Sequence, residues 1–247
     1  MLNEQTIEKL TELRLRSMAA AFREQLGNSA MNGLSFEDRF GLIVDRQYDD
    51  RKSSQIDRLI KSATFKFPGA SIENIEYRTD RNLNREQILH LASGKYIRGK
   101  NNIIVMGASG AGKTYIGCAL GVSACRQYKS TKYIRLPELL DDLNIARGEG
   151  EYKKVIAAYK KYALLIFDEW LLTPLTDIQT SDLFEIIESR YGEASTIFIA
   201  QSTPAGWHQM IGESRIADAI LDRIVHNSHE IRVEGDVSMR ERLGLHE

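Results

Sequence analysis

The sequence predicts an α/β protein with a parallel sheet flanked by helices, preceded by a small all-α N-terminal domain. Two patterns lead to this prediction. Beyond residue 100, short apolar runs at 102–106, 132–136, 163–167 and 196–200 alternate with helical stretches of roughly 10 to 20 residues, which is typical of buried parallel strands. Before residue 68, apolar side chains instead recur at three- and four-residue steps, the spacing of amphipathic helices.

The composition is that of a globular protein and excludes several other classes. The chain has 247 residues, 33 Lys+Arg against 34 Asp+Glu, a formal net charge of −1, and 43% hydrophobic residues. No apolar run approaches the roughly 18 residues of a membrane span, and the first ten residues do not resemble a signal peptide. The two cysteines, Cys118 and Cys125, suit a reduced chain. We therefore expect a cytoplasmic protein without a membrane partner.

The N-terminal domain is expected to contain two helices. The first spans residues 4–26, which carry apolar side chains along one face. The second begins at Ser35, which precedes Asp38 by the three residues of a capping box. Its apolar positions continue, less regularly, to Ile60.

The first strong helix breaker is Phe67-Pro68-Gly69. We therefore expect a helical domain at 1–67 for binding DNA or a partner or for oligomerisation, a linker at 68–80, and the α/β domain at 81–247. A short helix at 84–92 is expected to lead into the first strand.

The first strand of the α/β domain runs into a glycine-rich loop. The residues fit the pattern G-x-x-x-x-G-K-[ST] and read Gly107-Ala108-Ser109-Gly110-Ala111-Gly112-Lys113-Thr114. Glycines let backbone N–H groups turn toward phosphate oxygens, and the helix that follows directs its positive end at them. Lys113 is expected to contact the β- and γ-phosphates and the Thr114 hydroxyl to ligate Mg²⁺. With Tyr115, these residues form the expected ATP-binding set.

Two adjacent carboxylates end the third apolar run. Asp168 and Glu169 follow Leu164-Leu165-Ile166-Phe167, at the edge of the sheet where α/β proteins bind ligands. Asp168 is expected to hold Mg²⁺, and Glu169 to orient and polarise the attacking water. The alternative is that the pair only begins a solvated loop. The phosphate-binding loop upstream favours the catalytic interpretation.

Two polar residues downstream are further catalytic candidates. Gln201 ends the fourth apolar run, where it can hydrogen-bond the γ-phosphate or the attacking water, or else face solvent. Arg223 lies in an expected helix, and a neighbouring subunit could use it to stabilise the charge of the transferring phosphoryl group. An ion pair with Asp222 in the same helix is the alternative.

With these residues in order, the chain resembles the IstB/DnaC branch of the AAA+ ATPases, and most closely the IstB family of transposition helpers. The resemblance covers nearly the whole length and includes Leu91-Ala92-Ser93-Gly94, Asp182-Leu183-Phe184-Glu185-Ile186 and Ala217-Asp218-Ala219-Ile220-Leu221-Asp222-Arg223. It implies an AAA+ fold without a large C-terminal lid. It also implies that Gln201 is sensor 1, Arg223 a finger acting on a neighbouring subunit, and Arg240 a sensor 2 arginine.

The resemblance further implies ATP-dependent assembly on duplex DNA, with active sites at the interfaces of a homo-oligomer, and control of a transposase. The near-zero net charge means that DNA contacts must come from local clusters. Lys153 and Lys154 are candidates, and such phosphate contacts are largely independent of sequence. The basic residues of the N-terminal helices are interspersed with carboxylates, so a solvated helix is an equal alternative there.

The leading hypothesis is therefore an Mg²⁺-dependent ATPase that assembles on duplex DNA, bends it, and assists a transposase in the transposition of an insertion sequence. A replicative helicase loader of the DnaC type would share the same ATPase core. A nucleotide-gated architectural DNA-binding protein with little hydrolysis is the alternative from a different functional class.

Overall fold

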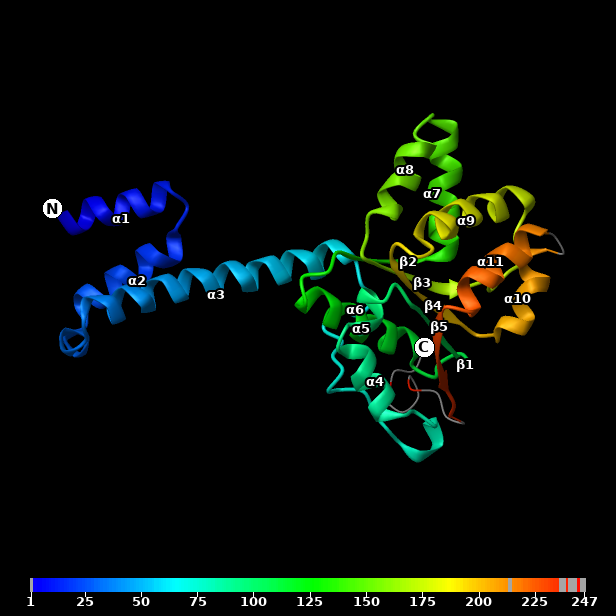
Figure 1. Ribbon diagram of the computed structural model, residues 1–247, viewed down its shortest axis with the longest axis horizontal. Helices are drawn as coiled ribbons and strands as arrows, with labels where there is room; N and C mark the ends of the chain where they lie inside the picture. The colour runs from blue at the N-terminus through cyan, green and yellow to red at the C-terminus, as the bar shows by residue number, and fades with distance from the viewer. Residues whose placement is uncertain (1, 213–214, 236–238, 240–243, 245–247) are drawn as a thin grey trace. The chain divides into compact units, whose positions relative to one another are not determined.

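The computed structural model describes residues 2–212 and 215–235 together with Met239 and Gly244. It divides into two compact units, Met1–Arg58 and Leu59–Glu247, whose elements are labelled in Figure 1. Arg240 and most of the residues after Gly235 lie outside the described residues, and so does the expectation about a C-terminal lid. No helix in the described part of the chain is long and apolar enough to cross a bilayer.

The first expected helix is in fact two helices, so the prediction of a single one was wrong. Helix α1 spans Leu2–Glu12 and α2 spans Arg16–Gly27, and the two pack against each other. Between them Arg14 has a left-handed φ of +61°, through which an α-helix does not continue. The five-residue step from Leu10 to Leu15 in the apolar pattern marks the break.

Helix α3 (Phe36–Ala63) follows a short 3₁₀ helix η1 (Ser29–Gly33) and begins directly after Ser35, as the capping pattern predicts. The backbone N–H of Asp38 donates to Ser35 Oγ at 3.1 Å, and that hydroxyl donates to Asp38 Oδ2 at 2.8 Å. The first of these bonds satisfies one of the backbone N–H donors that the first turn of a helix otherwise leaves unpaired, and the second fixes the hydroxyl that accepts it.

The larger unit begins within α3, earlier than the expected domain boundary. Ala63 at the end of α3, Phe65 just after it, and Ala70, Ile72 and Ile75 of the segment expected to be a linker lie in the same buried cluster as the sheet. The Phe-Pro-Gly breaker ends the helix locally, but the apolar residues around it still bury their surface. This segment therefore packs on the α/β unit.

The four apolar runs and one further strand near residue 230 form a five-stranded parallel sheet, which confirms the predicted fold class. Its strand order is β2-β3-β4-β1-β5. The strands are β1 (Asn102–Gly107), β2 (Thr131–Arg135), β3 (Leu164–Trp170), β4 (Ser195–Ala200) and β5 (Ser228–Val233). The helical elements of this unit are η2 (Thr79–Arg81), α4 (Arg85–Ala92), α5 (Lys95–Arg98), α6 (Lys113–Arg126), α7 (Leu136–Gly148), α8 (Tyr152–Lys160), α9 (Asp177–Arg190), α10 (Pro204–Ile211) and α11 (Arg215–Val225).

A buried core lies on each face of the sheet, because successive strand residues point to opposite faces. In β1, Ile103 points into a core with α4, α5 and α6, while Ile104 points into a core with the helices from α7 to α11. Cys118 and Cys125 are buried in the first core. The second core contains both tryptophans, Trp170 and Trp207.

The sheet order decides which residues meet at the site. Because all strands are parallel, their carboxyl ends lie at one edge. β4 lies between β1, which leads into the glycine-rich loop, and β3, which carries the two carboxylates. Gln201, directly after β4, therefore lies between the two motifs.

Candidate nucleotide-binding site

The glycine-rich loop follows β1 and passes into α6. Gly107, Gly110 and Gly112 have φ values of +152°, +77° and +88°, which side chains rarely tolerate. At Gly107 a Cβ atom would also lie 2.0 Å from the carbonyl oxygen of Val233 in β5. The pattern of glycines therefore produces the turn that a phosphate-binding loop requires, and the loop packs against the adjacent edge strand.

Lys113 is buried at the N-terminus of α6 and donates from Nζ to the carbonyl of Ala108 at 2.7 Å. Burial lowers the pKa of Lys113, and the charge of Asp168 only partly opposes this effect. Among the described residues this partly desolvated ammonium forms no direct ion pair with a carboxylate, so its charge can be met by a bound anion. The residues present therefore fit a bound phosphate chain.

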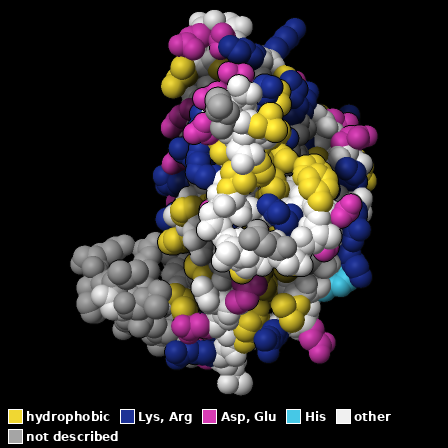
Figure 2. All heavy atoms as spheres, turned by 90° about the vertical axis from the view of Figure 1, so that its left-hand side faces the viewer, with side chains coloured by type: hydrophobic (Ala, Val, Ile, Leu, Met, Phe, Trp, Pro, Cys, Tyr) yellow, Lys and Arg dark blue, Asp and Glu magenta, His cyan; other side chains and the backbone are white. Residues whose placement is uncertain are grey.

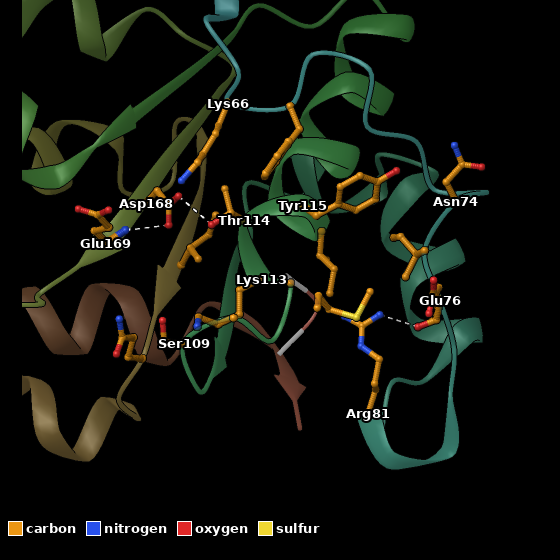
Figure 3. Close-up of a pocket in the computed structure, with 18 residues that line it drawn as sticks. Lys66, Asn74, Glu76, Arg81, Ser109, Lys113, Thr114, Tyr115, Asp168 and Glu169 are labelled. Atoms are coloured by element: carbon orange, nitrogen blue, oxygen red, sulfur yellow. Dashed lines mark hydrogen bonds between the residues drawn. The ribbon is translucent and has the colours of Figure 1, made fainter. Parts of the chain in front are cut away.

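The two carboxylates of β3 lie beside this loop. Thr114 donates from Oγ1 to Asp168 Oδ2 at 2.9 Å, and the backbone N–H of Glu169 donates to Asp168 Oδ1 at 2.8 Å (Figure 3). A hydroxyl and a carboxylate are oxygen ligands of the kind that Mg²⁺ prefers, and Mg²⁺ commonly takes its other ligands from water and phosphate. No cluster of three or more His, Cys, Asp or Glu suited to a metal occurs among the described residues.

A bulge in β3 explains why adjacent carboxylates both border the site. Phe167 pairs with Phe198 and Trp170 with Ala200, so β3 has one residue more than β4 in this stretch. Glu169 within the bulge has a left-handed φ of +55°. In a regular strand the two side chains would point to opposite faces of the sheet. Left-handed backbone at a residue other than glycine is strained and concentrates at functional sites.

Glu169 is held by an arginine from the neighbouring strand. Arg135, the last residue of β2, donates from Nη2 to Glu169 Oε2 at 2.6 Å and from Nη1 to Glu138 Oε1 at 3.1 Å. In Figure 3 the Glu169 carboxylate points away from Thr114 and Lys113. In this arrangement Glu169 does not reach toward the phosphate loop.

A cavity of about 410 Å³ joins these groups, a volume within the range of small-molecule sites. It is lined by residues that the sequence predicted for the site, namely Ser109, Gly110, Gly112, Lys113, Thr114, Tyr115, Asp168, Glu169 and Gln201. Gln201 thus borders the cavity together with both motifs, as the strand order predicts.

The lining also includes residues that sequence reasoning missed. Arg81 is buried and donates from Nη2 to the carbonyl of Ala111 at 2.8 Å, which ties the preceding segment to the phosphate loop. Lys66 extends into the cavity in Figure 3. Its segment is anchored by Tyr115, whose ring packs on Phe67 at 5.9 Å and whose Oη accepts from the N–H of Ser71. Lys66 follows the long helix in sequence and carries no motif that would have revealed it.

Arg223 lies elsewhere, in contacts within its own chain. It forms an ion pair with Glu188 of α9, and its guanidinium lies 5.3 Å from the Phe184 ring centroid. The pair with Asp222 considered as the alternative is replaced by this contact between helices. Arg223 is not among the described residues that line the nucleotide cavity. To act on a neighbouring subunit, its side chain would have to leave Glu188.

The candidate DNA contacts are exposed but mixed with acidic groups. Lys153 and Lys154 lie on the surface of α8, and Lys154 pairs with Glu151 at 2.9 Å. On the face drawn in Figure 2, Lys and Arg side chains lie among Asp and Glu side chains. The basic side chains on this face are therefore interspersed with acidic ones.

The sheet order and the phosphate loop define the AAA+ class of P-loop nucleotide-binding folds. Solved structures of this class are similar to the chain. AMPPCP-bound DnaA from Aquifex aeolicus has a TM-score of 0.59 and 18% identity, over 71% of this chain and 53% of that one. A DnaC helicase loader has a TM-score of 0.57 and 16% identity, over 67% and 97%.

Sequence comparison narrows the class to a family. Residues 8–245 match the IstB-like ATP binding proteins. The chain is 38% identical over 236 residues to a putative insertion sequence ATP-binding protein, y4pL, of Sinorhizobium fredii, covering 96% of each. It is 40% identical over 201 residues to the putative ATP-binding protein of insertion sequence IS1162 of Pseudomonas fluorescens, covering 81% of this chain and 87% of that one. The chain belongs to the IstB-like family of insertion sequence ATP-binding proteins.

Proposed function

We propose that this protein hydrolyses ATP with Mg²⁺ and uses the nucleotide to assemble on duplex DNA and assist a transposase. The observation that carries the catalytic part is the bulge in β3, because it leaves Asp168 in contact with Thr114 while Glu169 also lines the cavity that contains Lys113. A carboxylate that can orient water next to a phosphate-binding loop is what hydrolysis requires.

Each residue has a distinct part in this proposal. The loop N–H groups and Lys113 bind the phosphates, and Thr114 and Asp168 hold Mg²⁺, which would neutralise developing charge on the phosphate oxygens. Glu169 orients the attacking water once it has left Arg135. Gln201, which follows the neighbouring strand β4, donates a hydrogen bond to the γ-phosphate or to the attacking water.

Two arginines complete the proposed site. Arg223 of a neighbouring subunit contributes after release from Glu188, which would make hydrolysis depend on assembly. Arg240, outside the described residues, is proposed as the sensor 2 arginine.

The catalytic proposal is tested by phosphate release and nucleotide binding on the same variants. Glu169→Gln keeps the size of the side chain but removes the base, so ATP should still bind while turnover falls about 100-fold or more. Lys113→Ala should lose nucleotide binding itself. Turnover of Glu169→Gln equal to that of wild type would overturn the assignment.

The DNA and transposase part rests on the family, whose members are named as insertion sequence proteins. Light scattering of the protein with long duplex DNA should rise with ATP and not with ADP, and Glu169→Gln should hold the large complexes longer. End-to-end fluorescence transfer on a short duplex should report bending. A transposase encoded by the same element should co-purify with the assembled complex. Complexes that form equally well without nucleotide would contradict the proposal.

Two other functions have specific support. The fold likeness to a DnaC helicase loader favours a loader, which would capture a replicative helicase and prefer single strands. The Arg135–Glu169 contact favours a nucleotide-gated protein with little hydrolysis. A phosphate-release assay with and without DNA separates the latter from the leading proposal. The match to insertion sequence proteins over most of the chain makes the transposition role the better supported one.

A further inference from the structure

A buried tyrosine contacts the carboxylate that we assign to the metal. Tyr133 lies in β2, where it pairs with Ile166 of β3, two residues before Asp168. Its phenol donates from Oη to Asp168 Oδ2 at 2.7 Å. Tyr133 is 6% exposed and Asp168 is 4% exposed, so solvent competes little for this hydrogen bond.

The Asp168 carboxylate is thereby held from three directions. Besides Tyr133, Oδ2 accepts from the Thr114 hydroxyl at 2.9 Å, and Oδ1 accepts from the N–H of Glu169 at 2.8 Å. The Thr114 hydroxyl is itself a proposed ligand and belongs to the phosphate loop, and the Glu169 N–H belongs to the bulge. Tyr133 is the donor that belongs to neither motif and comes from a separate strand.

The orientation of a carboxylate about its last bond is soft, since the energy of this torsion in Asp has broad minima. A buried donor at fixed distance removes that freedom and leaves the remaining lone pairs aimed in one direction. Groups that orient metal ligands in this way change metal affinity, although they do not touch the ion.

We propose that Tyr133 is a positioning residue for the Mg²⁺ site, holding Asp168 in the orientation that binds the ion together with ATP. This inference rests on the proposed function, because it presumes that Asp168 is the metal carboxylate. The competing interpretation is that a core tyrosine merely uses Asp168 to satisfy a buried hydroxyl.

The chain offers a matched control for this distinction. Tyr96 lies in the same buried cluster as Tyr133 and is 4% exposed. Its Oη has no hydrogen-bond partner among the described residues. Tyr96→Phe therefore removes a buried hydroxyl from the same core without removing a bond to Asp168, whereas Tyr133→Phe removes that bond and keeps the ring that fills the core.

The experiment is equilibrium binding of a fluorescent ATP analogue to the full chain, first in EDTA and then over a Mg²⁺ titration. For Tyr133→Phe we expect unchanged binding in EDTA and a midpoint in Mg²⁺ about ten-fold higher than wild type. For Tyr96→Phe the midpoint should not move. Titration with Mn²⁺, monitored by electron paramagnetic resonance, should likewise show weaker ion binding for Tyr133→Phe than for Tyr96→Phe and wild type. Thermal melting should show that both variants are folded.

Equal Mg²⁺ midpoints for Tyr133→Phe and Tyr96→Phe would overturn the positioning role. Weaker binding of Tyr133→Phe in EDTA would also overturn it, because the defect would then lie in the fold or the phosphate loop. Asp168→Asn separates this failure from failure of the proposed function. If Asp168→Asn still responds to Mg²⁺ as wild type does, the assignment of the metal carboxylate fails. If it loses the response while Tyr133→Phe keeps it, only the role of Tyr133 fails.

Discussion

Removing the arginine that holds Glu169 should increase basal ATP turnover. The Arg135 Nη2 to Glu169 Oε2 contact is 2.6 Å, with side chains 43% and 28% exposed. A charge-assisted hydrogen bond between side chains this exposed stabilises the pair by about 1 kcal/mol, because solvent screens the two charges. Glu169 must give up this contact before it can orient water, so Arg135→Ala lowers the barrier by up to about 1 kcal/mol, or about five-fold in rate.

The assay is steady-state phosphate release at saturating ATP without DNA, and the control is Glu138→Ala. That variant removes the second partner of Arg135, which accepts at 3.1 Å, and leaves the contact with Glu169 in place. Its basal rate should therefore stay near wild type or fall. A basal rate for Arg135→Ala at or below that of wild type would refute the reasoning. In that case Arg135 would support Glu169 in catalysis and would not restrain it.

Two further predictions concern groups near the phosphate site. Lys66→Ala removes an ammonium that lines the cavity and should weaken ATP binding about five-fold. A five-fold change in affinity corresponds to about 1 kcal/mol, the energy of a solvent-accessible charged contact. Lys61→Ala removes an ammonium from the last turn of α3 and should leave the affinity measured by fluorescence titration unchanged. Equal affinities for the two variants would contradict the role of Lys66. Burial raises the pKa of Cys118 to about 11 and also raises that of Cys125, so at pH 8 both thiols are protonated and unreactive. A thiol-reactive chromophore should therefore modify neither in the native protein and both in guanidinium, and rapid native labelling would show that the core opens.

The predicted strands were confirmed because a buried parallel strand needs a continuous apolar run, a local property that residues 102–106 or 163–167 display by themselves. The first helix was predicted too long, since the left-handed backbone at Arg14 is visible only as a five-residue step in the pattern. The packing of Phe65 and Ile75 on the α/β unit could not be predicted, because it depends on apolar surface supplied by distant elements.

At the nucleotide site, the residues with a recognisable spacing were found and those without one were not. Lys113, Thr114 and Asp168 belong to motifs whose chemistry dictates their order along the chain. From the adjacent strand, Tyr133 donates to Asp168 and Arg135 donates to Glu169, in each case across more than 30 residues of sequence. Strand pairing, which no local pattern reports, brought them together.

By itself, the sequence determined the α/β class, the phosphate loop and the pair of carboxylates, because each follows from local periodicity or from a fixed spacing of residue types. Only the tertiary structure decided that Glu169 is turned by a bulge and held by Arg135, and that Arg223 is engaged with Glu188. The physical reason is the same in each case. A charged side chain takes the counterion that folding places nearest to it, and that neighbour is set by the register of strands and the packing of helices.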